Sequence, residues 1–287
     1  MSDLKPPFSI TVPGKDGDHR LECNTAVRSL PGRRLVCAGR WQGQDVYAKL
    51  FFSHRKARRD WQRGLHGIDA LLAAGIPTPP LLYAGHAPEH DCHVLVLAAI
   101  APAETLGQAW ENTGSMQERE RLVKTMARVF AGHHNAGIVH DDPHLNNFLV
   151  AGDRVYTLDG YDISRRRRPL RARRSLRNIA AFFSIIYSRP DNMAGIFFAA
   201  YAAARTLPLR DSDFYRFTRL VLKTRDRNIR KYLTDKIFRE CTAFTRKRSF
   251  RRLVMLSREH DSPGIQQLIN APADSLNSRS ATPVKQG

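Results

Sequence analysis

Apolar and polar residues alternate in short blocks along the first hundred residues, a pattern typical of β-strands. Val27–Leu30, Leu35–Trp41 and Asp45–Phe52 are three such blocks, and turns that contain glycine separate them. The run Val94–Leu97 is apolar throughout, which predicts a strand covered on both faces. We therefore expect a small antiparallel sheet in this part of the chain.

Helical spacing interrupts this pattern once before residue 100. Ser53 is a candidate N-cap for the helix, and Gly75 and Pro77 end it. The apolar residues that recur every three or four positions between these limits are Trp61, Leu65, Ile68 and Leu72. The sequence therefore predicts a single helix within the β-rich part.

From about residue 103 onward, helical spacing dominates. Ser115 and Glu118 form a capping box, in which each side chain satisfies an otherwise unpaired backbone N–H group. On one face, the helix that follows carries the stripe Leu122, Met126, Val129, Phe130 and His133. The run Met193–Ala204 predicts a buried helix, because a membrane crossing needs roughly 20 apolar residues.

These patterns divide the chain into four parts. Residues 1–25 are an N-terminal extension, 26–100 a β-rich lobe with one helix, and 101–260 a larger helical lobe. Residues 261–287 are rich in Ser, Asn, Ala and Pro, and we expect a disordered tail there. The predicted fold class is α+β, with a small antiparallel lobe followed by a helical one.

Composition narrows the class of protein. The hydrophobic share of 42% is enough for a core and excludes global disorder. Cys23, Cys37, Cys92 and Cys241 are scattered without a C-x-x-C pair, which favours reduced thiols, with the last two in the core. The N-terminus lacks the plan of a signal peptide, and we expect no membrane-spanning segment.

An excess of basic residues indicates a polyanionic partner. The chain has 46 Lys and Arg against 27 Asp and Glu, a formal net charge of +19. Seven arginines lie between Arg165 and Arg174, and a second basic region runs from Lys223 to Arg252. Nucleic acid, an anionic membrane face and a phosphorylated substrate all fit this charge. Any single arginine is equally compatible with a solvated face.

Three features that carry chemistry follow one another along the chain. Lys49 closes a strand, a His-x-Asp-x-x-x-x-Asn motif contains Asp142 and Asn147, and Asp159 ends a short apolar stretch before a glycine. Phosphoryl transfer from a nucleotide needs a fixed cation, a carboxylate that takes the proton of the acceptor, and oxygen ligands for Mg²⁺. Together these four residues supply all three.

Other interpretations of the same residues remain open. Asp162 is an alternative metal ligand to Asp159, although Asp159 directly follows the apolar stretch. Asp142 and Asn147 are also common turn and cap residues. A transition-metal site is a further alternative, with the candidates His133, His134, His140, Asp141, Asp142 and His144. It leaves Lys49 without a role, so phosphoryl transfer explains more of the sequence.

The sequence around these residues resembles a known family. The segments AKLF, HDDPHLNN and LDGY resemble the strand lysine, catalytic loop and metal loop of the protein-kinase-like fold. Further segments, GRRLVCAGRWQG, AAGIPTPPLLYAG, HNAGIVHDDPHLNNFLV and KIFRECTAF, are similar to the lipopolysaccharide kinase (Kdo/WaaP-type) family. The resemblance covers roughly residues 26–260. It implies a two-lobed kinase-like fold and ATP-dependent phosphorylation of a sugar hydroxyl, heptose or Kdo, in the lipopolysaccharide core.

The resemblance also implies roles for particular residues. Lys49 holds the phosphates of ATP, and Asp142 is the catalytic base or positions the acceptor hydroxyl. Asn147 and Asp159 hold Mg²⁺. His144 stands where protein kinases carry a catalytic-loop lysine, which resembles small-molecule phosphotransferases.

The resemblance implies four further positions, and all but the first depart from the kinase pattern. The adenine edge is expected against the backbone of residues 97–100, at Ala98. No G-x-G-x-x-G segment is present, so Gly32 is the candidate for covering the phosphates. Asp60, with Asp69 as the second choice, is the carboxylate expected to pair with the strand lysine. Asp141 replaces the arginine that would bind a phosphorylated loop, so we expect a permanently assembled site.

The implied partners follow from the resemblance and the charge. The acceptor is a sugar of the lipopolysaccharide core, and the enzyme is peripheral on the cytoplasmic face of a Gram-negative inner membrane. Arg165–Arg174 would contact either the anionic membrane surface or core phosphates. The basic clusters lack interleaved aromatic residues, which disfavours nucleic acid. The alternative function is a basic nucleic-acid- or membrane-binding protein on an inactive kinase-like scaffold.

Overall fold

A computed structural model describes residues 4–14, 17–30, 32–52, 56–186, 192–236, 244–248 and 253–270. The chain forms two compact units, Met1–Leu222 and Lys223–Gly287, and helix α6 (Asp211–Lys231) crosses the boundary between them. The expected end of the helical lobe at residue 260 is therefore wrong. The last buried residue of α6 is Val221, and none of the described residues after it is buried.

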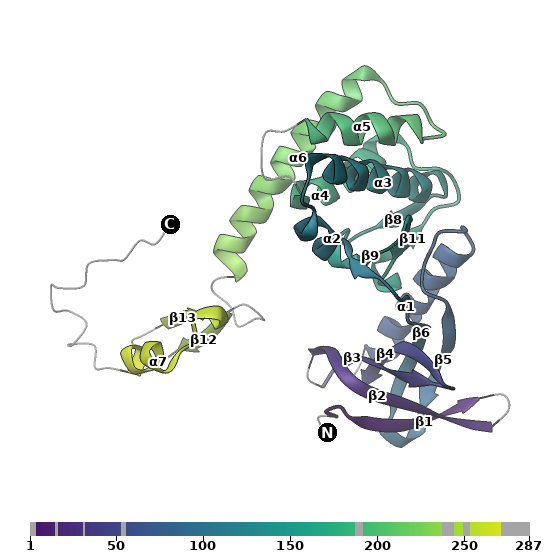
Figure 1. The fold of residues 1–287 in the computed structure, drawn as a ribbon, viewed down its shortest axis with the longest axis vertical. Coiled ribbons are helices and arrows are strands. Elements are labelled where there is room, and N and C mark those ends of the chain that lie inside the picture. Colours follow the sequence, from purple (N-terminus) through teal and green to yellow (C-terminus); the bar gives the residue numbers. More distant parts are fainter. Residues whose placement is uncertain are drawn as a thin grey trace. The chain divides into compact units, whose positions relative to one another are not determined.

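The first unit begins with a six-stranded antiparallel sheet of order β1-β2-β3-β4-β6-β5 (Figure 1). Its strands are β1 (Phe8–Gly14), β2 (Gly17–Leu30), β3 (Arg34–Trp41), β4 (Gln44–Phe52), β5 (Leu81–Ala87) and β6 (Cys92–Ala98). The short 3₁₀ helix η1 (Pro88–His90) joins the last two strands. The predicted strands are confirmed in β2, β3, β4 and β6, with shifted boundaries.

The expected N-terminal extension is wrong for the residues that form β1 and the first half of β2. Ile10 and Val12 on β1, and Leu21 and Cys23 on β2, are buried in the core of the sheet. Each pair is two residues apart, so the side chains of a pair point to the same face of the strand. The alternation that identified the later strands is present here as well.

Helix α1 (Ala57–Leu72) is the single predicted helix of the β-rich part. The indole Nε1 of Trp61 donates to the carbonyl oxygen of Val94 at 3.0 Å, and Ile68 is buried, so the helix packs against β6. Gly75, with a φ of +66°, follows its end. The residue in the N-cap position is Lys56, and the expected cap, Ser53, lies outside the described residues.

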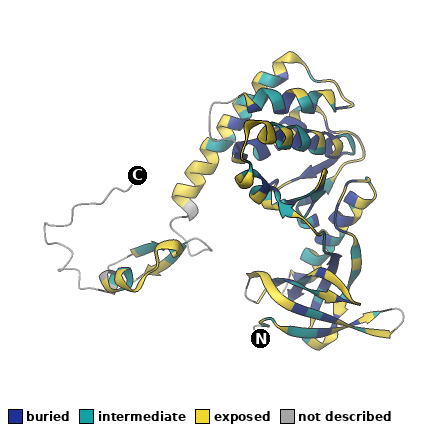
Figure 2. Ribbon diagram, viewed as in Figure 1, coloured by how far each residue is buried: buried dark blue, intermediate teal, exposed yellow. Residues whose placement is uncertain are grey.

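Helices form most of the remaining first unit. They are α2 (Leu106–Asn112), α3 (Met116–Asn135), α4 (Ala172–Ile186), α5 (Met193–Ala203) and the start of α6. The capping box of Ser115 and Glu118 is confirmed, and so is the buried helix over the apolar run, which is α5. Phe130, Phe182 and Phe197 meet in the core of these helices, which Figure 2 shows in dark blue. None of the described helices has the length and apolar character that crossing a membrane would need.

Short strands and 3₁₀ turns, joined by loops, lie between these helices. The strands are β7 (Glu104–Thr105), β8 (Ile138–His140), β9 (Phe148–Ala151), β10 (Arg154–Thr157) and β11 (Ile163–Arg165). The 3₁₀ turns are η2 (Leu145–Asn147) and η3 (Gly160–Asp162). Because β8 pairs with β11 and β9 with β10, the loop after β8 and the loop after β10 lie next to each other.

The second unit contains the hairpin of β12 (Phe244–Arg248) and β13 (Leu253–Ser257). A π-helical turn, η4 (Tyr232–Lys236), follows α6, and η5 (Arg258–His260) precedes α7 (Pro263–Asn270). The expected tail is therefore wrong for 263–270, where a proline at the first helical position favours helix initiation. Residues 271–287 of the expected tail lie outside the described residues, as does Cys241. The other three cysteines are free thiols, as predicted, and all three are buried.

Candidate active site

The loop after β8 is held by backbone hydrogen bonds at its start. The amide Nδ2 of Asn178, on α4, donates to the carbonyl oxygen of His140 at 2.7 Å. The N–H of Asp141 donates to the carbonyl oxygen of Asp162 at 2.7 Å. The His140 ring is buried against Phe148. These contacts agree with a scaffold role for His140.

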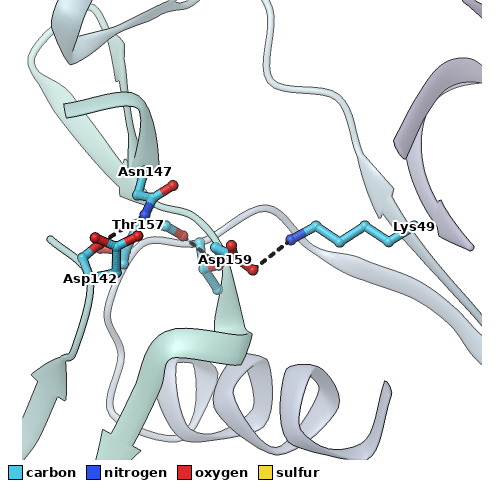
Figure 3. Close-up of polar contacts among 6 residues, drawn as sticks. Lys49, Asp142, Asn147, Thr157 and Asp159 are labelled. Carbon is cyan, nitrogen blue, oxygen red and sulfur yellow. Dashed lines mark hydrogen bonds and ion pairs between the residues drawn. The ribbon is translucent and has the colours of Figure 1, made fainter. Parts of the chain in front are cut away.

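Asp142 and Asn147, predicted five residues apart in one motif, are joined directly. Asn147 Nδ2 donates to the carbonyl oxygen of Asp142 at 2.8 Å (Figure 3). The His144 N–H donates to the same oxygen at 2.8 Å. The Leu158 N–H donates to the carbonyl oxygen of Asn147 at 2.8 Å, which ties the loop to the end of β10. The Asp142 carboxylate is exposed and has no ion pair among the described residues, so it is accessible to an acceptor hydroxyl.

Asp159 stands where the chain leaves β10. Its φ of +59° is rare outside glycine, and such conformations concentrate at functional sites. Lys49 Nζ lies 3.1 Å from Asp159 Oδ1, and the two side chains are only 16% and 19% exposed. Figure 3 shows the lysine extended toward this carboxylate. Burial raises the pKa of Asp159, but the charge and hydrogen bond of Lys49 outweigh burial, so the net pKa is lowered.

The strand before Asp159 is anchored on both sides. The Thr157 N–H donates to the carbonyl oxygen of Pro77 at 2.8 Å, and the Thr78 hydroxyl donates to the carbonyl oxygen of Thr157 at 2.9 Å. His133 Nε2 lies 3.0 Å from the Thr157 hydroxyl oxygen. The backbone that presents Asp159 is thus fixed to α3 and to the segment after α1.

Arg34 is a cation of the site that the sequence did not reveal. Its charge contributes to the lowered pKa of Asp159, after that of Lys49. In the β3–β4 register, Val36 lies opposite Lys49, and Arg34 is two residues before Val36. The Arg34 and Lys49 side chains therefore share one face of the sheet. The register of β3 against β4 is what places Arg34 beside Lys49, and a single sequence does not give strand register.

The expected pairing of Lys49 with a carboxylate of α1 is wrong in this structure. Lys49 pairs with Asp159, and neither Asp60 nor Asp69 forms an ion pair with it. Asp60 Oδ1 is buried without a hydrogen-bond partner among the described residues, and Arg59 Nη2 lies 3.5 Å from it.

Two further predicted positions lie at the ends of strands. Gly32, with a φ of +66°, occupies the turn between β2 and β3. Ala98 ends β6, and its N–H already donates to the carbonyl oxygen of Pro80 at 2.9 Å. The Ala99 N–H likewise donates to the carbonyl oxygen of Asp45 at 2.9 Å. An adenine edge at this segment would therefore need backbone groups other than these two N–H groups.

The donors around Asp159 have the chemistry that a hard divalent cation requires. Asn147 uses its amide nitrogen on Asp142, which leaves its amide oxygen for a cation. Burial, followed by the charges of Asp159 and Asp142, raises the pKa of Asp162 to about 6. No three His, Cys, Asp or Glu side chains of the described residues converge on one point. Mg²⁺ is usually held by one or two carboxylates together with nucleotide phosphates and water, and Asp159 and Asn147 are the residues that would hold it here.

Two histidines of the transition-metal alternative, His133 and His134, hydrogen-bond to structural partners instead. His134 Nε2 faces Asn178 Oδ1 at 2.9 Å, and its Nδ1 faces the Tyr201 hydroxyl at 2.6 Å. Because an amide oxygen only accepts, the proton of His134 belongs on Nε2. Burial lowers the pKa of both His133 and His134 to about 3. Both are neutral members of the hydrogen-bond network that supports the loops.

The arrangement brings together a cation, oxygen ligands and an accessible carboxylate, the groups that phosphoryl transfer needs within one site. Such a set of groups is typical of phosphotransferases of the kinase class. Residues 35–186, just over half of the chain, match the model of the lipopolysaccharide kinase (Kdo/WaaP) family, and the chain belongs to that family. No curated protein matches it. Membership in a kinase family implies that ATP is the phosphoryl donor.

Proposed function

We propose that this protein transfers the γ-phosphoryl group of ATP to a sugar hydroxyl, heptose or Kdo, of the lipopolysaccharide core. The family match supports the kinase class and the lipopolysaccharide connection. The single observation that carries the proposal is the ion pair of Lys49 with Asp159, next to the joined Asp142 and Asn147. The sheet with α1 and the helical part would then be the two lobes of a kinase-like fold, with ATP between them.

The described residues divide the work of the reaction. Lys49 and Arg34 would face the phosphates of ATP, while Asn147 and Asp159 would hold Mg²⁺, which neutralises phosphate charge when bound. The acceptor oxygen attacks the γ-phosphorus, the bond to ADP breaks, and the Asp142 carboxylate takes the proton of the hydroxyl. The backbone contacts of the loop hold Asp142 in position before the substrates arrive.

Binding of MgATP tests the nucleotide site without knowledge of the acceptor. MgATP at 100 times its Kd should stabilise the native state by about 2.7 kcal/mol, because it binds only the folded protein. We expect the melting temperature to rise, and Lys49→Ala combined with Asp159→Ala to remove the rise. Arg128→Gln, an exposed change on α3, is the matched control. An unchanged wild-type melting curve at millimolar MgATP would favour the inactive scaffold.

The acceptor is tested by mass spectrometry of the lipopolysaccharide core. A strain that lacks this protein should lack one core phosphate, and the purified enzyme with MgATP should restore it in vitro. The position of the restored phosphate identifies the sugar and the hydroxyl. A deletion strain with a fully phosphorylated core would contradict the proposed acceptor.

We also propose that the protein is peripheral on the anionic cytoplasmic face of the inner membrane. The basic segment 166–168 is exposed and fixed to the fold: the Arg166 N–H donates to the carbonyl oxygen of Gly137, and the Leu170 N–H to that of His134, each at 2.8 Å. The buried Arg205 also donates to Leu170. Fixed cations next to an anionic leaflet contribute about 1 kcal/mol each.

Sedimentation with anionic vesicles tests the membrane proposal. Binding should be strong at low salt and should weaken as salt screens the charges. Replacing Arg166, Arg167 and Arg168 with Gln should weaken it further, while Arg128→Gln should not. Preferential binding of duplex DNA or RNA over vesicles would favour the nucleic-acid alternative.

A further inference from the structure

A second polar site lies behind the metal loop, between α1 and β11. A pocket of about 380 Å³ is lined by Arg59, Gln62, Arg63, His66, Ala70, Ile163 and Arg165. The first five recur at helical spacing and therefore lie on one face of α1. Ile163 and Arg165 are two residues apart on β11, so they share one face of the strand. We call this the basic pocket.

The side chains that line the basic pocket include several hydrogen-bond donors. It contains three guanidinium groups, an imidazole and an amide, and no carboxylate. Arg63 stacks over the Tyr161 ring, with its guanidinium carbon 4.2 Å from the ring centre, so its orientation is fixed. Among the described residues, neither Arg63 nor Arg165 forms an ion pair with a carboxylate. Arg59 does pair with Asp60, and the charge of Arg63 also acts on Asp162, so Arg165 is the pocket arginine without a carboxylate partner among the described residues.

We propose that the basic pocket binds a phosphate group. Arginine guanidinium groups form paired hydrogen bonds to phosphate oxygens, and several arginines around one pocket suit a dianion. The volume lies within the range of small-molecule sites, so part of an attached sugar also fits. The phosphate comes either from the saccharide acceptor itself or from a free phosphate compound. The first source rests on the proposed function, whereas the binding chemistry does not.

A phosphate bound in this pocket would affect the reaction, because the pocket adjoins the loop that carries Asp159. Helix α1 also packs against η3, where Gly67 lies against the backbone of Gly160. A phosphate held jointly by Arg63 and Arg165 would join α1 to the strand that follows the metal loop. It would thereby fix a phosphorylated acceptor, or the helix itself, relative to Asp159.

Inorganic phosphate is the first probe, with melting temperature as the readout at constant ionic strength and chloride as the reference anion. Phosphate should raise the melting temperature of the wild type more than chloride does. The double variant Arg63→Gln/Arg165→Gln should bind phosphate at least about tenfold more weakly, the loss expected for charged hydrogen bonds. Arg58→Gln, on the same helix but outside the pocket, should keep the wild-type response. Without phosphate, Arg165→Gln should melt at or above the wild-type temperature, because a repelled cation is removed.

Two outcomes of this experiment would overturn the proposal. If Lys49→Ala abolishes the phosphate response and the double variant keeps it, phosphate binds at the nucleotide site. If Arg58→Gln weakens binding as much as the double variant does, the effect is one of general charge.

The KM for the acceptor distinguishes the two sources. If the acceptor supplies the phosphate, removing core phosphates should raise the KM of the wild type but not that of the double variant. Equal KM values for both cores in the wild type assign the pocket to a free phosphate compound. A wild type that binds phosphate in the basic pocket but not MgATP would refute the proposed kinase function and leave this assignment intact.

Discussion

The two sides of the active site are held very differently. On the helical side, the backbone of the catalytic and metal loops is fixed through His140, Asp142, Asn147 and Thr157. On the side of the sheet, Lys49 makes one ion pair, and Asp60, the carboxylate expected to position it, pairs with Arg59 instead. The helical side is therefore held by several hydrogen bonds to backbone groups, and the lysine of the sheet side by one ion pair.

This difference suits phosphoryl transfer. In the proposed reaction, the base and the metal ligands must lie within a fraction of an ångström of their working positions, which agrees with their supports being hydrogen bonds to backbone. The lysine proposed to bind phosphate must accept a ligand that enters and leaves. A single ion pair to Asp159 keeps it in the site and can be exchanged for phosphate oxygens.

The largest effect should come from the fixed side. Asp142→Asn keeps the size of the side chain and removes the basic carboxylate, so MgATP should still bind. A positioned base contributes about 10²–10⁴-fold to rate, so turnover should fall by that factor. Phosphate transfer to core from the deletion strain is the assay, and Asp141→Asn, the neighbouring exposed aspartate, is the control. Loss of transfer in Asp141→Asn alone would show that the base is assigned to the wrong residue.

Acid should also destabilise the helical side of the site, because buried neutral histidines support it. The pKa of His133 and of His134 is about 3 in the fold, against an ordinary value of about 6.5. The unfolded chain therefore binds more protons between these values, and stability falls as the pH falls below 6.5. Each histidine should cost roughly 2 kcal/mol by pH 5.

Urea unfolding at several pH values between 7 and 5 measures how the free energy of unfolding changes with pH. His133→Gln should reduce this dependence by the contribution of about one bound proton, and the same replacement at the exposed His260 is the control. An unaltered slope in His133→Gln would show that this histidine is not held neutral by burial.

The sequence predicted the fixed side better than the side of the sheet. The Asp142–Asn147 spacing, the capping box before α3 and the apolar stretch before Asp159 are local patterns, and all three are found. Their hydrogen bonds join residues close in the chain or follow a motif whose spacing is itself the signal.

The features that the sequence missed depend on contacts between distant segments. Arg34 enters the site through the register of two strands, and Asp60 fails to meet Lys49 because of where α1 lies. The pocket between Arg63 and Arg165 joins residues about a hundred positions apart. Local periodicity carries no information on such distances, so only the fold could reveal these contacts.

The smallest effect should come from the contact that joins the two sides. Gly67 on α1 lies against Gly160, and a Cβ at position 67 would overlap the Gly160 carbonyl oxygen. Gly67→Ala must therefore move α1 away from the metal loop, at an expected cost of about 1–3 kcal/mol. The displacement also carries Asp60, Arg63 and the rest of α1 away from the site, so turnover should fall as well.

Gly132→Ala is the matched control for this contact. Gly132 lies in the interior of α3, is exposed and has open space where a Cβ would be added. Alanine there should stabilise the protein by roughly 0.5–1 kcal/mol, because glycine loses more backbone freedom in a helix. Of the two variants, only Gly67→Ala should therefore lower the free energy of unfolding in urea and the rate in the transfer assay. If both variants were stabilised and fully active, α1 would not be packed on the metal loop, and the two sides of the site would be mechanically independent.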